Sequence, residues 1–321
     1  MTSDGEYEWL RMPFGLINAG SSFIKAVEMV IRPIKEWTIT YVDDMGVGAF
    51  NMPQHFQRLK IFFTTLQSAG FTLNLRKSEF AKNEVKFVGH IIGSGHKRPD
   101  PDRIAKIKEL QRPADKKQLR SVLGLLGYHR DYVQNFAALA RPLTLLTAKN
   151  APNILNWGEK EENAFQLIKQ KLCTVTLLHI PVIGQPFIIR TDSSGFATGA
   201  AIYQLVNPQA QITETGKGEK PIAFFSQKLS PQQTKWSTIE REAFAIWATL
   251  RRYHNLIFGS PIVVFCDHNP LSYIVKGVTQ SPKLVRWSLA LQVYNITFRY
   301  VKAAHNKVAD FLSRMPDNGA A

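Results

Sequence analysis

Two adjacent acidic residues, Asp43 and Asp44, stand between two short apolar runs at residues 37–42 and 45–50. Strand-favouring runs on both sides of a polar pair predict a hairpin with the acids at its tip. Neighbouring strand residues point to opposite faces, so one acid can aim at a metal while the other sits at the turn. A divalent cation would relieve the repulsion between the two carboxylates. Taken alone, the pair also fits a polar turn that binds no metal.

A second group of acids lies in the last third of the chain. Predicted strands end at two of them, and predicted helices carry the other two. Carboxylates placed in this way can converge on one pocket, where hard cations stabilise them. Two Mg²⁺ ions about 3.5 to 4 Å apart would activate water and stabilise the leaving oxygen in phosphodiester hydrolysis. The hypothesis of a metal-dependent nuclease therefore rests on four acids together: Asp192, Glu242, Asp267 and Asp310.

The elements around the first pair alternate between helix and strand. Apolar residues at three-and-four spacing predict helices at residues 18–31 and 55–69. Strands are predicted at residues 7–12 and 71–75, and a strand pair at residues 85–92. This order favours an α+β sandwich with the acids at the edge of its sheet.

A basic helical segment follows the glycine-rich joint at residues 93–95. Helical periodicity covers residues 99–146, with Asp115 as a predicted N-cap. One face of the helix after it is predicted to be buried: Leu119, Val122, Leu123 and Leu126. Between Arg76 and Arg130 there are fourteen basic and six acidic residues, a composition suited to gripping a nucleic-acid backbone.

The last third is predicted to form a mixed sheet flanked by helices. A linker at residues 150–158 and a helix at 159–172 precede it. The predicted strands are residues 187–192, 197–205, 221–226, 262–266 and 297–301, and the predicted helices are 238–253, 270–275, 283–293 and 306–314. The fold class is thus a multidomain α+β and α/β protein.

Composition limits the class of protein further. The chain has 321 residues, 45% of them hydrophobic, which is enough for two or three domains. We find no membrane-spanning apolar run and no signal-peptide pattern, and therefore expect a soluble intracellular protein. Cys173 and Cys266 lack metal-ligand spacing, so neither a disulfide nor a zinc site is expected. The net charge of +15 predicts a polyanionic partner.

In the order of its motifs, the chain resembles the pol polyprotein of gypsy-type LTR retrotransposons. Residues 7–16 resemble the strand and turn that shape the nucleotide pocket, which implicates Phe14 and Gly15. Tyr41-Val42-Asp43-Asp44 resembles the polymerase metal hairpin, and Lys77 follows a motif whose lysine lies near the triphosphate. Residues 87–90 are similar to the primer grip, and residues 120–128 to the thumb helix that tracks the duplex.

The resemblance continues through the four acids, which match the catalytic motifs of ribonuclease H. Glu240 competes with Glu242 for the role of the catalytic glutamate. The family pattern of a glutamate, two further residues and an alanine selects Glu242. The two glutamates are half a helical turn apart, which would aim Glu240 elsewhere. His305 stands where the family has glycine and is interpreted as a loop residue.

The resemblance implies five segments in the chain. They are a truncated reverse transcriptase palm (1–93), a thumb (94–149), a linker or connection (150–180), a ribonuclease H domain (181–315) and a tail (316–321). A third metal-binding aspartate and the fingers, which the family places before the motif at residues 7–16, are not in this sequence. Gly20 and Ile24 also replace the family's proline and glutamine. Little or no polymerase activity is therefore expected from this chain alone.

We expect a reverse transcriptase and ribonuclease H fragment that cuts RNA in RNA–DNA hybrids with Mg²⁺, or alternatively Mn²⁺. The implied partners are the hybrid and a template–primer duplex, with deoxynucleotides only if the missing palm strand and fingers are supplied. No membrane partner is expected. The implied location is the cytoplasm, in retroelement particles, with access to the nucleus. The alternative is a non-catalytic nucleic-acid-binding remnant or domesticated protein; a generic basic adaptor would not require the acids.

Overall fold

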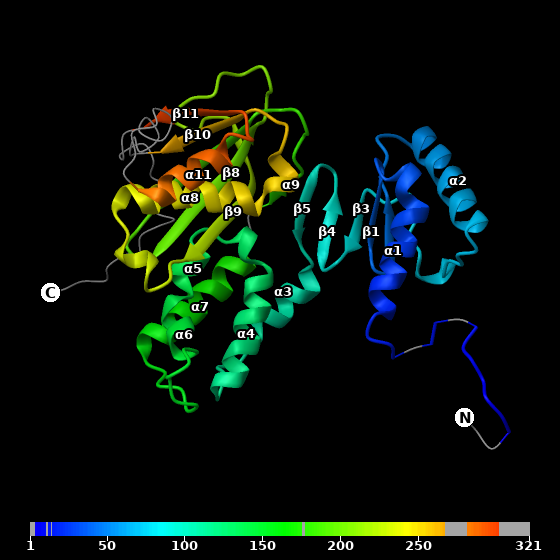
Figure 1. Cartoon of the computed structure of the whole chain (residues 1–321), viewed down its shortest axis with the longest axis horizontal. Helices are drawn as coiled ribbons and strands as arrows, with labels where there is room; N and C mark the ends of the chain where they lie inside the picture. The colour runs from blue at the N-terminus through cyan, green and yellow to red at the C-terminus, as the bar shows by residue number, and fades with distance from the viewer. Residues whose placement is uncertain (1–3, 11, 14, 175–176, 267–280, 302–321) are drawn as a thin grey trace. The chain divides into compact units, whose positions relative to one another are not determined.

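The computed structural model describes residues 4–10, 12–13, 15–174, 177–266 and 281–301. The chain divides into two compact units, Met1–Ser94 and Gly95–Ala321. Both units combine helices with β-strands, as Figure 1 shows.

In the first unit, two helices pack against a β-hairpin. The helices are α1 (Ala19–Ile31) and α2 (Met52–Ser68), and the antiparallel strands of the hairpin are β1 (Thr38–Tyr41) and β2 (Asp44–Val47). Both predicted helices and the predicted hairpin are present. The apolar stripes of the helices supply most of a small core that consists of Val27, Ile31, Ile34, Phe62 and Leu66.

The ends of α2 follow from local chemistry. The Asn51 side chain accepts a hydrogen bond from Gln54 N at 3.0 Å, which satisfies one free amide of the first turn. Pro53 lies in that turn, where the lack of an N–H costs nothing. Gly70 follows the helix with a φ of +74°, a left-handed conformation that glycine adopts without steric cost. Because of the cap and the proline in its first turn, α2 begins three residues before its predicted start.

The strand predicted at residues 71–75 is wrong. A short 3-10 turn, η2 (Leu75–Lys77), begins there instead. The Asn74 side chain accepts a hydrogen bond from Arg76 N, and Ser78 Oγ donates to Asn74 O. Such local bonds compete with sheet pairing and turn the chain. The predicted strand pair follows as β3 (Glu84–Phe87) and β4 (His90–Gly93).

The strand predicted at residues 7–12 is also wrong where the structure describes it. Residues 6–10 belong to no strand, and Tyr7, Trp9 and Leu10 are exposed. An alternating apolar pattern forms a stable strand only when a neighbour accepts its hydrogen bonds and covers one face. None of the described strands pairs with these residues.

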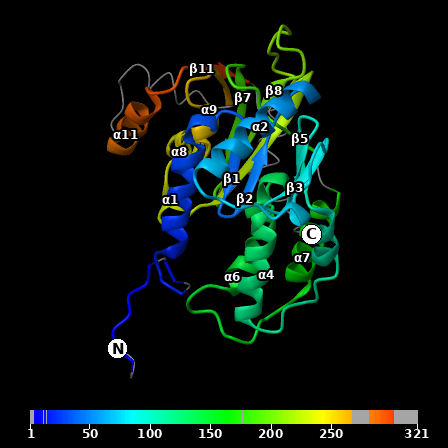
Figure 2. The ribbon, with the colours of Figure 1, turned by 90° about the vertical axis from the view of Figure 1, so that its right-hand side faces the viewer.

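The second unit begins with the short strand β5 (His96–Pro99) and a helical lobe. Asp115 caps α4 as predicted, because its side chain accepts the Gln118 N–H at 2.7 Å. Leu119 and Leu126 are fully buried, and Val122 and Leu123 pack beside them. Figure 2 shows α4, α6 and α7 close together in the lobe. The helices of the lobe are α3 (Pro101–Lys108), α4 (Lys116–Tyr128), α5 (Phe136–Leu139), α6 (Arg141–Leu146) and α7 (Glu159–Cys173).

A five-stranded mixed sheet forms the rest of the unit, in the order β11-β10-β7-β8-β9. β10 runs parallel to both β7 and β11, whereas β7, β8 and β9 pair antiparallel. The mixed sheet predicted for this region is therefore present. Its strands are β7 (Phe187–Ser193), β8 (Ala197–Leu205), β9 (Glu219–Lys228), β10 (Ile262–Cys266) and β11 (Ile296–Tyr300).

Each face of this sheet carries its own core. Helices α8 (Thr238–Arg252) and α11 (Pro282–Leu291) cover one face, with Phe187 and Ile189 beneath them. The other face is covered in part by Tyr132 and by Leu178 of β6 (Leu178–His179). Side chains therefore alternate between two buried faces along β7.

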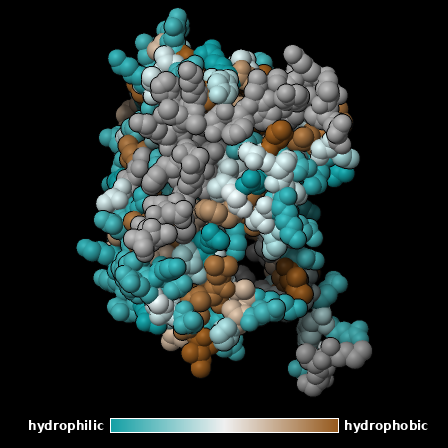
Figure 3. All heavy atoms as spheres, turned by 90° about the vertical axis from the view of Figure 1, so that its left-hand side faces the viewer, coloured by the Kyte–Doolittle hydropathy of each residue, from teal (hydrophilic) through white to brown (hydrophobic). Residues whose placement is uncertain are grey.

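On the side of the molecule drawn in Figure 3, most of the coloured surface is hydrophilic, with hydrophobic patches in a few places.

Two predicted helices, residues 270–275 and 306–314, lie outside the described residues. Among the helices that the structure does describe, none is both long enough and apolar enough to cross a bilayer.

Candidate functional site

The hairpin places Asp43 and Asp44 at neighbouring but different positions. Tyr41 pairs with Asp44, so Val42 and Asp43 form the two-residue loop and Asp44 is the first residue of β2. Both aspartates are exposed. Val42 has a φ of 55°, a left-handed conformation that is strongly unfavourable for a β-branched residue. The hairpin therefore holds Asp43 in a strained loop, directly before Asp44 at the start of β2.

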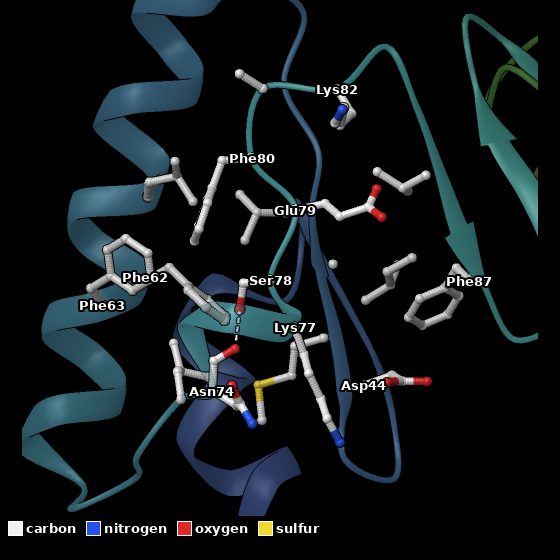
Figure 4. A pocket seen from close by; sticks show the side chains of 18 of the residues that line it. Asp44, Phe62, Phe63, Asn74, Lys77, Ser78, Glu79, Phe80, Lys82 and Phe87 are labelled. Atoms are coloured by element: carbon white, nitrogen blue, oxygen red, sulfur yellow. Dashed lines mark hydrogen bonds between the residues drawn. The ribbon is translucent and has the colours of Figure 1, made fainter.

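The same acids line a cavity of about 520 Å³ within the first unit. Lys77, at the end of η2, lines it as well, so three of the predicted polymerase residues meet at one cavity. Figure 4 shows Asp44 and Lys77 on one side of this cavity and the rings of Phe62 and Phe63 on the other. An ammonium group and two carboxylates in the lining of one cavity suit a site for an anionic ligand with a metal ion.

The other two predicted nucleotide-pocket residues do not extend this site. Gly15 is exposed, has a φ of +93°, and does not line the cavity. Phe14 lies outside the described residues.

In the second unit, Glu242 on α8 contacts the end of β7, the strand that contains Asp192. Ser193 N, at the end of β7, donates a hydrogen bond of 3.1 Å to Glu242 Oε1 on α8. Asp192 is the residue before Ser193 in the same strand. Glu242 is only 1% exposed. A buried carboxylate requires hydrogen bonds or a cation to offset the lost hydration, which makes this end of the sheet a candidate metal site.

A capping box fixes the start of α8 and distinguishes its two glutamates. Ser237 Oγ accepts from Glu240 N at 3.2 Å, while Glu240 Oε2 accepts from Ser237 N at 3.1 Å. Glu240 Oε1 also accepts from Ser281 Oγ at 3.0 Å. Burial acts to raise the pKa of Glu240, but these hydrogen bonds and the nearby Lys283 ammonium hold that pKa below its usual value. Glu242 is therefore the glutamate of α8 that lies beside β7.

β10 brings the chain to the same end of the sheet. It runs parallel to β7, with Phe265 opposite Arg190 and with Cys266 as its last residue. Asp267, which follows, lies outside the described residues, as do Asp310 and His305. The structure thus describes the carboxylate of one predicted acid, Glu242, and for Asp192 only the position of the residue in β7. Among the described residues, no three His, Cys, Asp or Glu side chains form a cluster able to hold a metal.

Arg241 also lies at this site but was not predicted from the sequence. Its Nη1 is 3.5 Å from the position that a Cβ on Gly195 would take, next to the end of β7. The one available signal was its place between Glu240 and Glu242, since an arginine between two acids at a predicted site is a natural ligand for phosphate.

Comparison with known families identifies both units. Residues 1–92 match the family described as reverse transcriptase (RNA-dependent DNA polymerase), and residues 183–294 match the RNase H-like domain found in reverse transcriptase. Together with the fold, these matches show that the chain contains a reverse transcriptase domain and a ribonuclease H-like domain.

The sequence relatives narrow the family. The chain is 32% identical to the retrovirus-related Pol polyproteins from transposons 297 and opus of Drosophila melanogaster, over 98% of its length in each case. It is 31% identical to that from transposon gypsy of the same species over 97% of its length. The chain belongs to the Pol polyproteins of gypsy-type retrotransposons. It spans 28%, 32% and 30% of these three relatives, respectively.

Solved structures share the fold. The foamy viral protease-reverse transcriptase in complex with an RNA/DNA hybrid aligns with a TM-score of 0.78 and 24% identity, over 97% of this chain and 41% of that chain. The same viral protein in complex with dsDNA aligns with a TM-score of 0.75 and 24% identity, over 92% of this chain and 60% of that chain. The predicted fold class, palm and helical segment followed by a ribonuclease H-like sheet, is confirmed.

Proposed function

We propose that this chain cleaves the RNA strand of RNA–DNA hybrids in a reaction that needs a divalent metal ion. The contact between β7 and α8 carries the proposal, because the hydrogen bond from Ser193 N to Glu242 Oε1 lies directly beside Asp192. Two of the four predicted catalytic acids thereby share one end of the sheet. Asp267 and Asp310 complete the proposed set on the sequence pattern alone.

The donor set fits Mg²⁺, with Mn²⁺ as the alternative. Carboxylate oxygens are hard ligands, and a buried glutamate is stabilised by a divalent cation. Asp192, Glu242, Asp267 and Asp310 would hold the metal. When bound, such ions activate water and stabilise the leaving oxygen of a phosphodiester. The chain contributes the orientation of Glu242, which the Ser193 amide fixes on one side and the capped α8 on the other.

Nucleic acid is the proposed partner, as an RNA–DNA hybrid or a template–primer duplex. Fourteen basic residues against six acidic ones between Arg76 and Arg130 support phosphate contacts by the helical lobe and the turns before it. The foamy viral relative in fold forms a complex with an RNA/DNA hybrid, which supports the same class of ligand. Selectivity for the hybrid would come from duplex shape and the 2′-hydroxyl groups.

The first unit supports polymerase ancestry. Asp43 and Asp44 would bind metal, and Lys77 would approach a triphosphate, since all three line one cavity. Phe14 and Gly15 would lie near the nucleotide on the sequence pattern alone. A two-metal polymerase site needs acids from two strands, and the hairpin supplies acids from one. We therefore rank hydrolysis ahead of polymerisation as the activity of this chain.

The proposed location of the protein is the cytoplasm, within retroelement particles and with access to the nucleus.

The test is cleavage of a hybrid with labelled RNA by the purified chain in Mg²⁺. Asp192→Asn and Glu242→Gln should each lower the rate by about 100-fold, which corresponds to about 2.7 kcal/mol of activation free energy. Chelation with EDTA should abolish cleavage. Glu159→Gln is the matched control, because Glu159 is exposed in the first turn of α7 and its removal changes the charge equally.

Absence of Mg²⁺-dependent cleavage would reject the hydrolase, as would equal cleavage by wild type and Asp192→Asn. Binding of the hybrid without cleavage would then favour the second candidate, a non-catalytic nucleic-acid-binding protein, which the basic composition of residues 76–130 supports. Primer extension by the chain alone would contradict the ranking of the two activities.

A further inference from the structure

The proposed cleavage reaction assigns no role to the guanidinium group of Arg241. It lies on α8 between the capping residue Glu240 and the proposed metal ligand Glu242. Arg241 Nη2 donates to Thr238 Oγ1 at 3.4 Å, a long and weak contact. Its Nε is buried and has no hydrogen-bond partner within the described part of the chain.

Among the residues that the structure describes, no carboxylate forms an ion pair with Arg241. This contrasts with Arg190, whose Nη2 lies 2.7 Å from Glu219 Oε1 in a buried pair. A partly buried guanidinium with an unsatisfied N–H is costly unless a ligand completes its hydrogen bonds.

A pinned turn lies against this guanidinium. Ser194 N donates to Ala197 O at 2.9 Å, and Ala197 N donates to Ser194 Oγ at 3.1 Å, which closes the turn. Gly195 is exposed at its tip, and Arg241 Nη1 lies 3.5 Å from where its Cβ would be. The Arg141 guanidinium carbon lies 4.6 Å from the centre of the Phe196 ring. The turn after β7 is thus held in place beside Arg241, and Gly195 adds no side chain there.

The turn and the guanidinium stand next to the proposed metal ligands. Ser193, which donates to Glu242, is two residues before Gly195. Ser193 Oγ is itself buried without a described hydrogen-bond partner. An arginine fork matches the geometry of phosphate oxygens, and the Ser193 hydroxyl can add a further donor.

We propose that Arg241, with the turn from Ser193 to Phe196, binds a backbone phosphate of the nucleic-acid strand that enters the Asp192 and Glu242 site. The inference rests on the proposed function for its substrate, but the phosphate contact itself can be measured without cleavage. Arg241 acts as a binding residue whose charge draws one phosphate beside the metal-binding carboxylates.

The test measures the affinity of the full chain for a fluorescent RNA–DNA hybrid in EDTA, at a series of salt concentrations. Arg241→Gln should weaken binding about tenfold and reduce the slope of log affinity against log salt by about one. Arg241→Lys should restore part of the affinity, because it keeps the charge but loses the fork. Arg252→Gln, exposed in the last turn of the same helix, is the control and should change the slope much less.

Kinetics in Mg²⁺ give a second readout. Arg241→Gln should raise the KM for the hybrid about tenfold while kcat changes little, since a ground-state phosphate contact is lost.

Unchanged affinity, salt slope and KM in Arg241→Gln would overturn the inference while leaving cleavage by the wild type intact. An altered Mg²⁺ requirement with unchanged hybrid affinity would also overturn it, because Arg241 would then compensate the charge of the carboxylates. If the wild type binds but never cleaves, the proposed function fails and the binding comparison still decides this inference. Should Arg241→Gln not fold, Arg241→Lys against wild type decides it.

Discussion

At the scale of single residues, Val42 shows how the hairpin positions its acids at a cost in stability. Its φ of 55° places a β-branched side chain in the left-handed region, where only glycine is unstrained. The loop must turn within two residues because Tyr41 pairs directly with Asp44. The register of the hairpin therefore imposes the strain and puts Asp43 in the loop.

Val42→Gly should raise the free energy of unfolding by about 1 kcal/mol. Relief of the strained backbone contributes about 1 to 3 kcal/mol, and the greater freedom of glycine in the unfolded chain offsets about 0.5 to 1 kcal/mol. Urea unfolding of the full chain measures the change. Val47→Gly, in β2 and packed against the core, is the control and should lower stability. Equal losses in both variants would contradict the strain at Val42.

At the scale of elements, patterns with local causes were predictable. The bounds of β8 (Ala197–Leu205) and β10 (Ile262–Cys266) match the prediction, because apolar and β-branched runs mark buried strands. Residues 71–75 have a similar alternation, but the side chain of Asn74 turns the chain there. The contact of Arg241 with the Gly195 turn depends on the packing of α8 against β7, which no local pattern specifies.

Glu240 links the start of α8 to the start of α11 and makes their packing sensitive to pH. It accepts hydrogen bonds from Ser237 N and from Ser281 Oγ, and lies 3.5 Å from Lys283 Nζ. Burial opposes ionisation, but these contacts lower the pKa of Glu240 below its ordinary value of 4.5. The stabilisation is therefore fully present above pH 4.5 and is lost as pH falls through the lowered pKa.

Glu240→Gln should lower the Tm at pH 7, and its difference from wild type should shrink as pH falls below 4.5. Thermal unfolding between pH 3 and pH 7 checks this. Ser281→Ala removes one of the donors and should produce a smaller loss with the same pH dependence. A Tm difference that stays constant across this range would rule out the carboxylate as its source.

At the scale of the molecule, the edge strand of the ribonuclease H-like sheet is one of the places where the second unit joins that sheet to the helical lobe. β9 is the outer strand of the sheet, and Ser226 lies within it. Ser226 O accepts from Arg130 Nη2 at 3.3 Å, and Ser226 Oγ accepts from Ala137 N at 3.1 Å. These contacts cover an edge that would otherwise be open to pairing with another chain. They also connect the basic lobe to the domain proposed to cut the hybrid.

Ser226→Ala should therefore destabilise the whole second unit. Ser226 is 7% exposed, and losing its hydroxyl leaves the Ala137 N–H without its acceptor, at a cost of about 1 to 3 kcal/mol. For a unit of this size, each kcal/mol lowers the Tm by about 2 to 4 °C. Ser121→Ala, on the exposed surface of α4, is the control and should leave the Tm unchanged or slightly raised, because alanine favours helix. If the two variants have the same Tm, the Ser226 contact does not hold the lobe to the sheet.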